Sequence, residues 1–176
     1  MTEFITLNYY FRCDSYDAEL ILSRGFMKNH KTNGNLGLAI YLTDLIENNL
    51  NGKSIILNVD LSDINGILFV KDIDELVYKY IQSPKLIQLY EKDGLNSSLG
   101  NKYILPFIRD NNFNGLRIIN DNLLILLNNK NIKFIRIYDE ELKTIRIYSA
   151  PEETRYIIDD ENKIFGDHNG NKLIWG

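Results

Sequence analysis

Two polar stretches and one tyrosine are the places where this sequence could do chemistry. The first stretch, Arg-Cys-Asp-Ser at residues 12–15, puts a cation at the end of an expected strand and directly before an expected helix. The free amides of a helix N-terminus favour a phosphate or carbonyl oxygen, and a guanidinium adds charge-assisted hydrogen bonds. The simpler interpretation is a surface salt bridge from Arg12 to Asp14 or Asp17, and the residues alone favour it.

The tyrosine and the second stretch also allow two interpretations each. Tyr41 lies inside an apolar run at residues 38–42, where an aromatic ring is normally core and its hydroxyl bonds to the backbone. Asp121 is the centre of Asn120-Asp121-Asn122 between two apolar runs, which is typical of a tight turn. An acid at the edge of a cleft would instead stabilise a developing cation.

Two other sets of side chains could also be functional. Glu152 and Glu153 follow Pro151, where a solvated loop is the simpler interpretation of two acids. Cys13 and His30 would make a thiol nucleophile and its base, but no third group supports them, so we interpret Cys13 as a strand residue. The sequence has neither a glycine-rich phosphate loop nor a nucleophile elbow.

Composition limits the classes of protein to consider. The chain has 176 residues, of which 44% are hydrophobic and 25% charged, so we expect one globular domain. The net charge of −4 disfavours a constitutive binder of phosphate backbones. One cysteine and two histidines exclude an internal disulfide and leave no cluster with zinc-ligand spacing. The first residues do not resemble a signal peptide and no apolar run is long enough to span a bilayer, so we expect a cytoplasmic protein that does not enter membranes.

Hydrophobic patterning predicts an α+β fold. Residues 15–24 repeat apolar side chains at helical spacing and end at Gly25, which predicts a helix packed on a sheet. A polar loop is expected at residues 30–35, and helices are expected between residues 72 and 112, with one interrupted or started by Pro106. The expected strands are residues 9–13, 38–42, 54–61, 67–70, 116–119, 123–127, 132–138, 144–148, 154–158 and 172–175.

Taken in order, three motifs resemble the ADP-ribosyltransferase fold, especially its branch related to diphtheria toxin and the poly(ADP-ribose) polymerases. The first is the aromatic strand at residues 10–14, followed by a helix that closes in Ile-Leu-Ser-Arg-Gly-Phe at residues 21–26. The second is Gly-Leu-Ala-Ile-Tyr-Leu-Thr-Asp at residues 37–44, and the third is residues 120–125 continuing to 131–134. The resemblance implies a single domain over residues 1–176. It would have a split antiparallel sheet, a helical insertion at about 72–112 and C-terminal hairpins at about 132–176.

The chain departs from the pattern of that branch at four points. Arg12 replaces a histidine, as in the branch related to cholera toxin, whose Arg-x-Asp-Ser motif is similar to residues 12–15. Cys13 replaces a glycine, and no tyrosine lies at residues 51–52, where the second aromatic of the nicotinamide clamp would be. Asp121 stands in place of a glutamate. In the arginine-bearing branch the acid would come from Glu-x-Glu, to which Glu152 and Glu153 are the nearest approximation.

The resemblance implies an enzyme that uses NAD as substrate, either a mono-ADP-ribosyltransferase or an NAD glycohydrolase. Arg12, with Ser15, would hold pyrophosphate or ribose oxygens, and the backbone of Cys13 would pair with the nicotinamide carboxamide. Tyr41, beside Thr43, would stack on the nicotinamide ring. Asp121 would stabilise the ribosyl cation and, being shorter than glutamate, favours single transfer over polymer synthesis.

The partners implied are NAD and an unidentified intracellular macromolecule, protein or nucleic acid, as expected of a toxin or effector. The His-Tyr-Glu catalytic triad of the first branch would be Arg12, Tyr41 and Asp121 in this chain. Because two of these three residues differ and the nicotinamide clamp is incomplete, the alternative is a catalytically inactive module that binds a protein or nucleotide. The RNA phosphotransferase branch of the same fold needs several cations around the phosphate, and only Arg12 is placed for that role.

Overall fold

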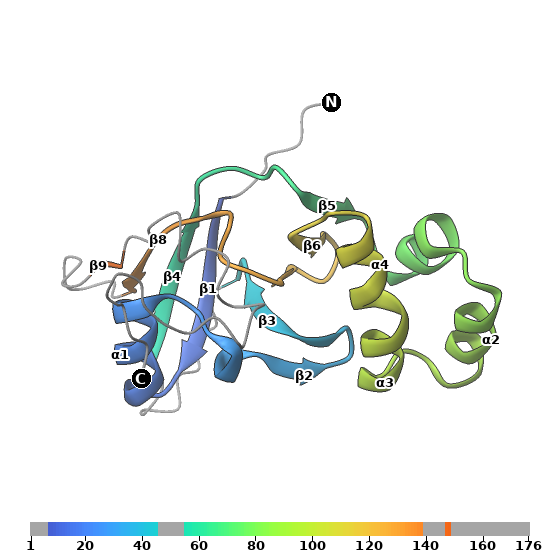
Figure 1. The fold of residues 1–176 in the computed structure, drawn as a ribbon, viewed down its shortest axis with the longest axis horizontal. Coiled ribbons are helices and arrows are strands. Elements are labelled where there is room, and N and C mark those ends of the chain that lie inside the picture. The colour runs from blue at the N-terminus through green and yellow to red at the C-terminus, as the bar shows by residue number, and fades with distance from the viewer. Residues whose placement is uncertain (1–6, 46–54, 139–146, 149–176) are drawn as a thin grey trace. The chain divides into compact units, whose positions relative to one another are not determined.

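The computed structural model describes residues 7–45, 55–138 and 147–148 (Figure 1). These residues group into two compact units. The first unit holds the described residues within 1–30, 45–64 and 127–176, and the second holds residues 31–44 and 65–126.

The first unit is an antiparallel sheet that packs against one helix. Its strands β1 (Asn8–Cys13), β4 (Ile55–Leu61), β8 (Ile132–Ile137) and β9 (Ile147–Tyr148) lie in that order. Helix α1 (Ser15–Arg24) contacts β4 and β8 and buries Ala18, Ile21 and Leu22. A short 3-10 turn, η1 (Lys28–His30), follows the helix.

Both ends of α1 agree with the sequence prediction. The Asp14 carboxylate accepts a hydrogen bond of 2.8 Å from the amide of Asp17 and so caps the first turn. Gly25 ends the helix with a φ of 81°, a left-handed value that glycine adopts without a steric penalty. The prediction of a helix over residues 15–24 is therefore confirmed.

The second unit joins a mixed sheet to a helical segment. Its strand order is β5 (Ile67–Val70), β6 (Gly115–Ile118), β7 (Leu123–Leu126) and β3 (Gly37–Thr43), with β2 (Thr32–Gly34) also paired to β3. The β5–β6 pair is parallel and the others are antiparallel. Five helical elements lie between β5 and β6 along the chain: η2 (Glu75–Ile81), α2 (Pro84–Asp93), α3 (Ser97–Leu99), η3 (Gly100–Ile104) and α4 (Leu105–Asp110).

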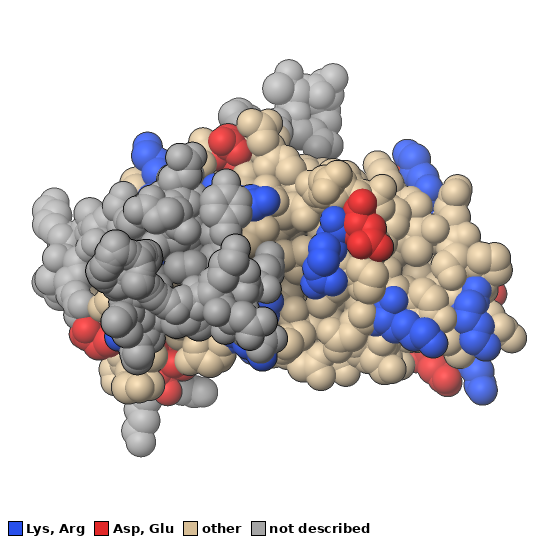
Figure 2. Space-filling model, viewed as in Figure 1, with Lys and Arg blue, Asp and Glu red and all other residues tan. Residues whose placement is uncertain are grey.

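The fold class is α+β, as the patterning predicted, because helices and strands are segregated and the described pairings are mostly antiparallel. The ADP-ribosyltransferase type of core stays a prediction. On the face drawn in Figure 2, the described Lys and Arg side chains lie singly or in small groups among uncharged and acidic ones, without a continuous basic stripe. Within the described ranges, no helix has the length and apolar character needed to cross a membrane.

One local prediction needs correction. Residues 30–35 are not a polar loop, because residues 32–34 form β2 and pair with β3 through the turn at Asn35-Leu36. Gly37 makes this turn possible with a φ of 106°. Pro106 lies in the first turn of α4, which agrees with the predicted alternative of a helix started by this proline, and η3 continues directly into that turn.

Several predicted elements lie outside the described residues. They are the strands at 154–158 and 172–175 and most of the strand at 144–148.

A close backbone contact fixes the helical segment to the β2–β3 hairpin. A Cβ atom placed on Gly100 would lie 2.2 Å from the carbonyl carbon of Leu36 and 2.3 Å from the amide nitrogen of Gly37. The Asn101 side chain accepts a 2.8 Å hydrogen bond from the Leu38 amide and donates one of 2.8 Å to Asn33. No residue other than glycine therefore fits at position 100 without moving one backbone away from the other.

Gly100→Ala should destabilise the protein by about 1–3 kcal/mol, because the added methyl group overpacks against backbone that cannot rotate aside. The sign of the change in unfolding free energy is informative, because a Gly→Ala change in an unconstrained helix stabilises the protein by about 1 kcal/mol. Urea unfolding measures the difference, and Ser98→Ala, at an exposed position in the same helical run, should stay within about 0.5 kcal/mol of the parent. A Gly100→Ala protein as stable as the parent would contradict the close contact.

Candidate functional site

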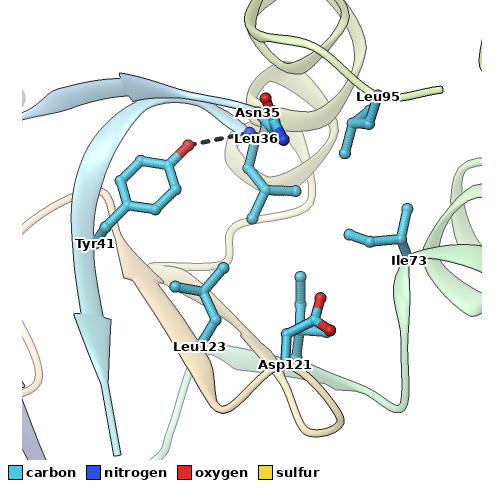
Figure 3. Close-up of a pocket in the computed structure, with 8 residues that line it drawn as sticks. Asn35, Leu36, Tyr41, Ile73, Leu95, Asp121 and Leu123 are labelled. Carbon is cyan, nitrogen blue, oxygen red and sulfur yellow. Dashed lines mark hydrogen bonds between the residues drawn. The ribbon is translucent and has the colours of Figure 1, made fainter. Parts of the chain in front are cut away.

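A pocket of about 260 Å³ in the second unit is lined by both Tyr41 and Asp121 (Figure 3). Its other lining residues are Asn35, Leu36, Ile73, Leu95, Ile118 and Leu123. Most of these side chains are apolar, which is typical of sites that bind small organic groups. The pocket therefore brings together two of the three residues predicted to be catalytic.

Four segments position this lining. The β2–β3 hairpin supplies Asn35, Leu36 and Tyr41. The end of β6, with the following turn and β7, supplies Ile118, Asp121 and Leu123. Ile73 follows β5, and Leu95 follows α2. Ile73 and Leu95 also pack against the small helical core of Val77, Leu86 and Leu99.

Tyr41 is held by the backbone of its own hairpin. Its hydroxyl accepts a 3.0 Å hydrogen bond from the Leu36 amide (Figure 3). It also donates one of 2.7 Å to the Gly37 carbonyl. Burial raises the pKa of the Tyr41 hydroxyl, so the phenol stays protonated at neutral pH. A Cβ on Gly34 would lie 2.6 Å from the ring carbon Cζ, so the ring packs directly on that glycine. The hydroxyl thus bonds to the backbone, as the simpler interpretation of Tyr41 predicts, while the ring forms a wall of the pocket.

Asp121 lies in the tight turn that joins β6 to β7. The Asn122 amide donates a 3.1 Å hydrogen bond to the Ile119 carbonyl, and Asn122 has a φ of 53°. Asparagine is among the residues that tolerate this left-handed conformation, so turn geometry explains the Asn-Asp-Asn sequence. The Asp121 side chain is exposed, and its carboxylate has no hydrogen-bond or ion-pair partner within the described part of the chain. The carboxylate is available to a ligand. The position of Asp121 therefore fits both interpretations, a turn residue and an acid that stabilises a developing cation.

An ion pair that the sequence analysis overlooked secures this turn. The Asp44 amide donates a 3.2 Å hydrogen bond to the Asn122 carbonyl, and the Asp44 carboxylate pairs with the Arg117 guanidinium on β6. The two side chains are only 16% and 8% exposed. An arginine within an otherwise apolar strand was the signal in the sequence, because a charge there must be paired.

Arg12, Cys13 and Ser15 belong to the first unit. Arg12 is exposed on β1 opposite Ile56, and Ser15 is the first residue of α1. The N-cap is Asp14, whose carboxylate already takes one of the amides of the first helical turn. An anion at this terminus would therefore share it with a resident carboxylate.

The environments of Cys13 and His30 do not suit a thiol nucleophile and its base. Burial, with the nearby charges of Asp17 and Asp14, raises the pKa of Cys13 from 9.0 to about 12. His30 is buried, and its Nδ1 accepts a 2.9 Å hydrogen bond from the Met27 amide. Burial lowers the pKa of His30, although Asp17 acts in the opposite direction. Cys13 thus carries almost no thiolate at neutral pH, in agreement with its interpretation as a strand residue.

Thr43, Glu152 and Glu153 are the remaining predicted site residues. Thr43 pairs with Leu123 in the β3–β7 ladder but is not a lining residue. Glu152 and Glu153 lie outside the described residues. Among the residues that are described, no group of three or more His, Cys, Asp and Glu side chains could hold a metal ion.

Comparison with known proteins adds no family to this description. No family model, no curated protein and no solved structure matches the chain.

Cys13 should react slowly with iodoacetamide. A thiol pKa raised by about three units lowers the thiolate fraction at pH 8 by a factor on the order of 10³ relative to the unfolded chain. Because Cys13 is the single cysteine, the alkylation rates of the folded protein and of the urea-unfolded protein can be compared directly by mass spectrometry. Rates within tenfold of each other would show an accessible thiolate. The same shift makes the folded state less stable as pH rises above about 9, since only the unfolded thiol ionises there.

Asp44→Asn should cost about 3 kcal/mol of unfolding free energy, because it removes the charge that neutralises a largely buried guanidinium. Denaturant titration measures this loss. The matched control is Asp93→Asn at an exposed position near the end of α2, with an expected change below about 0.5 kcal/mol. Equal effects of the two substitutions would refute a stabilising role for the buried pair.

Proposed function

We propose that this protein consumes NAD as a mono-ADP-ribosyltransferase or NAD glycohydrolase, with the nicotinamide end of NAD in the pocket of the second unit. The observation that carries the proposal is that Tyr41 and Asp121, 80 positions apart, line one pocket. The resemblance assigns these two residues to ring stacking and to cation stabilisation.

The size and lining of the pocket support a single ring as its occupant. Its volume of about 260 Å³ lies just below the range of about 300–1,000 Å³ for pockets that enclose drug-sized ligands. One heteroaromatic ring fits this space better than a whole dinucleotide does. The Tyr41 ring offers an aromatic surface, and the leucine and isoleucine side chains exclude water from the ring.

The proposed reaction breaks the bond between the ribose carbon and the nicotinamide nitrogen. The bonding electron pair goes to the nitrogen, so neutral nicotinamide leaves and positive charge develops on the ribose. The Asp121 carboxylate stabilises that charge, which is greatest in the transition state. An acceptor oxygen or nitrogen, or a water molecule, then bonds to the ribose carbon and releases a proton.

The rest of NAD and the acceptor are assigned from the resemblance. Arg12 and Ser15, in the first unit, are the residues that the resemblance assigns to the pyrophosphate or ribose oxygens, and the backbone of Cys13 is what it assigns to the nicotinamide carboxamide. The acceptor is a macromolecule inside a cell, and the role is that of a toxin or effector.

A specific observation favours a second candidate, a catalytically inactive module that binds a protein or nucleotide. Turn geometry accounts for the Asp121 segment without catalysis, and the Tyr41 hydroxyl is fully engaged by Leu36 and Gly37. Such a module would keep the pocket and lose NAD turnover.

Asp121→Asn separates the two candidates. This change keeps the size and turn preference of the side chain but removes its charge, so we expect the melting temperature to stay nearly constant. Nicotinamide release should fall by a factor of about 100 or more, because the charge that stabilises the transition state is lost. Release of nicotinamide from NAD, followed by chromatography, is the measurement, and Asp93→Asn is the control that should keep full activity.

A double change, Glu152→Gln with Glu153→Gln, tests the alternative acid. Loss of turnover in this variant with full activity in Asp121→Asn would move the catalytic role to Glu152 or Glu153. No NAD turnover by the parent protein would exclude catalysis and leave the binding module.

A further inference from the structure

The pocket carries two polar side chains beside Tyr41, and they lie apart. In Figure 3 the Asn35 amide and the Asp121 carboxylate lie at opposite ends of the ring of lining residues, with the apolar side chains between them. The Asn35 side chain is exposed and has no hydrogen-bond partner within the residues the structure describes. Its amide can therefore both donate to a ligand and accept from it.

The turn that carries Asn35 is held in place. The amide of the next residue, Leu36, donates to the Tyr41 hydroxyl, and Gly37 lies against Gly100 of the helical segment. Asn35 thus projects from a braced two-residue turn instead of a free loop. A side chain held in this way can discriminate between ligands by hydrogen bonding.

We propose that Asn35 is a specificity residue that pairs with the carboxamide of a nicotinamide ring, and that the pocket rejects the corresponding carboxylate, nicotinate. The proposal rests on the function proposed above. It gives Asn35 a contact that the resemblance alone assigns to the backbone of Cys13.

The two polar side chains of the pocket match two groups of a nicotinamide ring that is bonded to ribose. In nicotinamide the carboxamide is on the ring carbon meta to the nitrogen that joins the ribose, so the two groups leave the ring in different directions. The carboxamide can therefore meet Asn35 while the ribose bond lies on the side of Asp121. Two carboxamides form a reciprocal pair of N–H to O=C hydrogen bonds. A carboxylate offers no donor to the Asn35 oxygen, and its charge is repelled by Asp121 in a pocket with apolar walls.

Binding of nicotinamide, benzamide and nicotinate, measured by ligand-observed NMR, tests the proposal without any need for turnover. Wild-type protein should bind nicotinamide at least tenfold more tightly than nicotinate, and benzamide should bind because it keeps the carboxamide. Asn35→Ala should weaken the affinity for nicotinamide about tenfold. Asn35→Asp, which keeps the turn preference but loses the donor, should weaken it as well.

The control is Asn111→Ala, which alters an exposed asparagine whose amide bonds to the Phe107 carbonyl, and it should leave all three affinities unchanged. Melting curves identify any variant that does not fold. Unchanged nicotinamide affinity in both folded Asn35 variants, or equal affinity of the parent for nicotinate, would overturn the role of Asn35 while leaving the proposed function intact. If neither nicotinamide nor benzamide binds to the parent at millimolar concentration, the proposed function fails as well.

Discussion

The contact of Gly100 with the backbone of Leu36 and Gly37 is the constraint on which the second unit depends. Because two backbones meet there without an intervening side chain, the helical segment fixes the β2–β3 turn in position. That turn in turn presents the Leu36 amide to the Tyr41 hydroxyl and places Asn35 at the pocket. One glycine thereby determines the position of three lining residues that come from a different part of the chain.

The opposite end of the pocket depends on electrostatics. Asp121 lies in a turn whose carbonyl at Asn122 is bonded to the Asp44 amide, and the Asp44 carboxylate neutralises Arg117. Buried ion pairs contribute little net stability, because desolvation offsets much of their attraction, but they penalise every arrangement that separates the charges. In this structure the pair ties the end of β3 to β6, which flanks the turn that carries Asp121.

Much of the fold follows from local sequence, and most of the site does not. Helix α1 has an N-cap acid, a helical apolar period and a terminating glycine, so its bounds were predictable from residues 14–25. The strand β2 was not predicted because Thr32–Gly34 contains no apolar side chain and so shows no hydrophobic alternation. Pairing with β3 defines this strand. Tyr41 and Asp121 were selected by resemblance, whereas Asn35 and Arg117 owe their positions to contacts between distant segments that no local pattern reports.

Ile73 and Leu95 have neighbours on two sides, because they line the pocket and also pack on the small core of Val77, Leu86 and Leu99. Any molecule that contacts these two side chains raises the free energy of local opening of η2 and α2. Linkage makes the effect reciprocal, so whatever restrains these helices strengthens that molecule's affinity by the same factor. Amide hydrogen exchange across residues 75–93 would therefore register occupancy of a pocket that those residues do not themselves line.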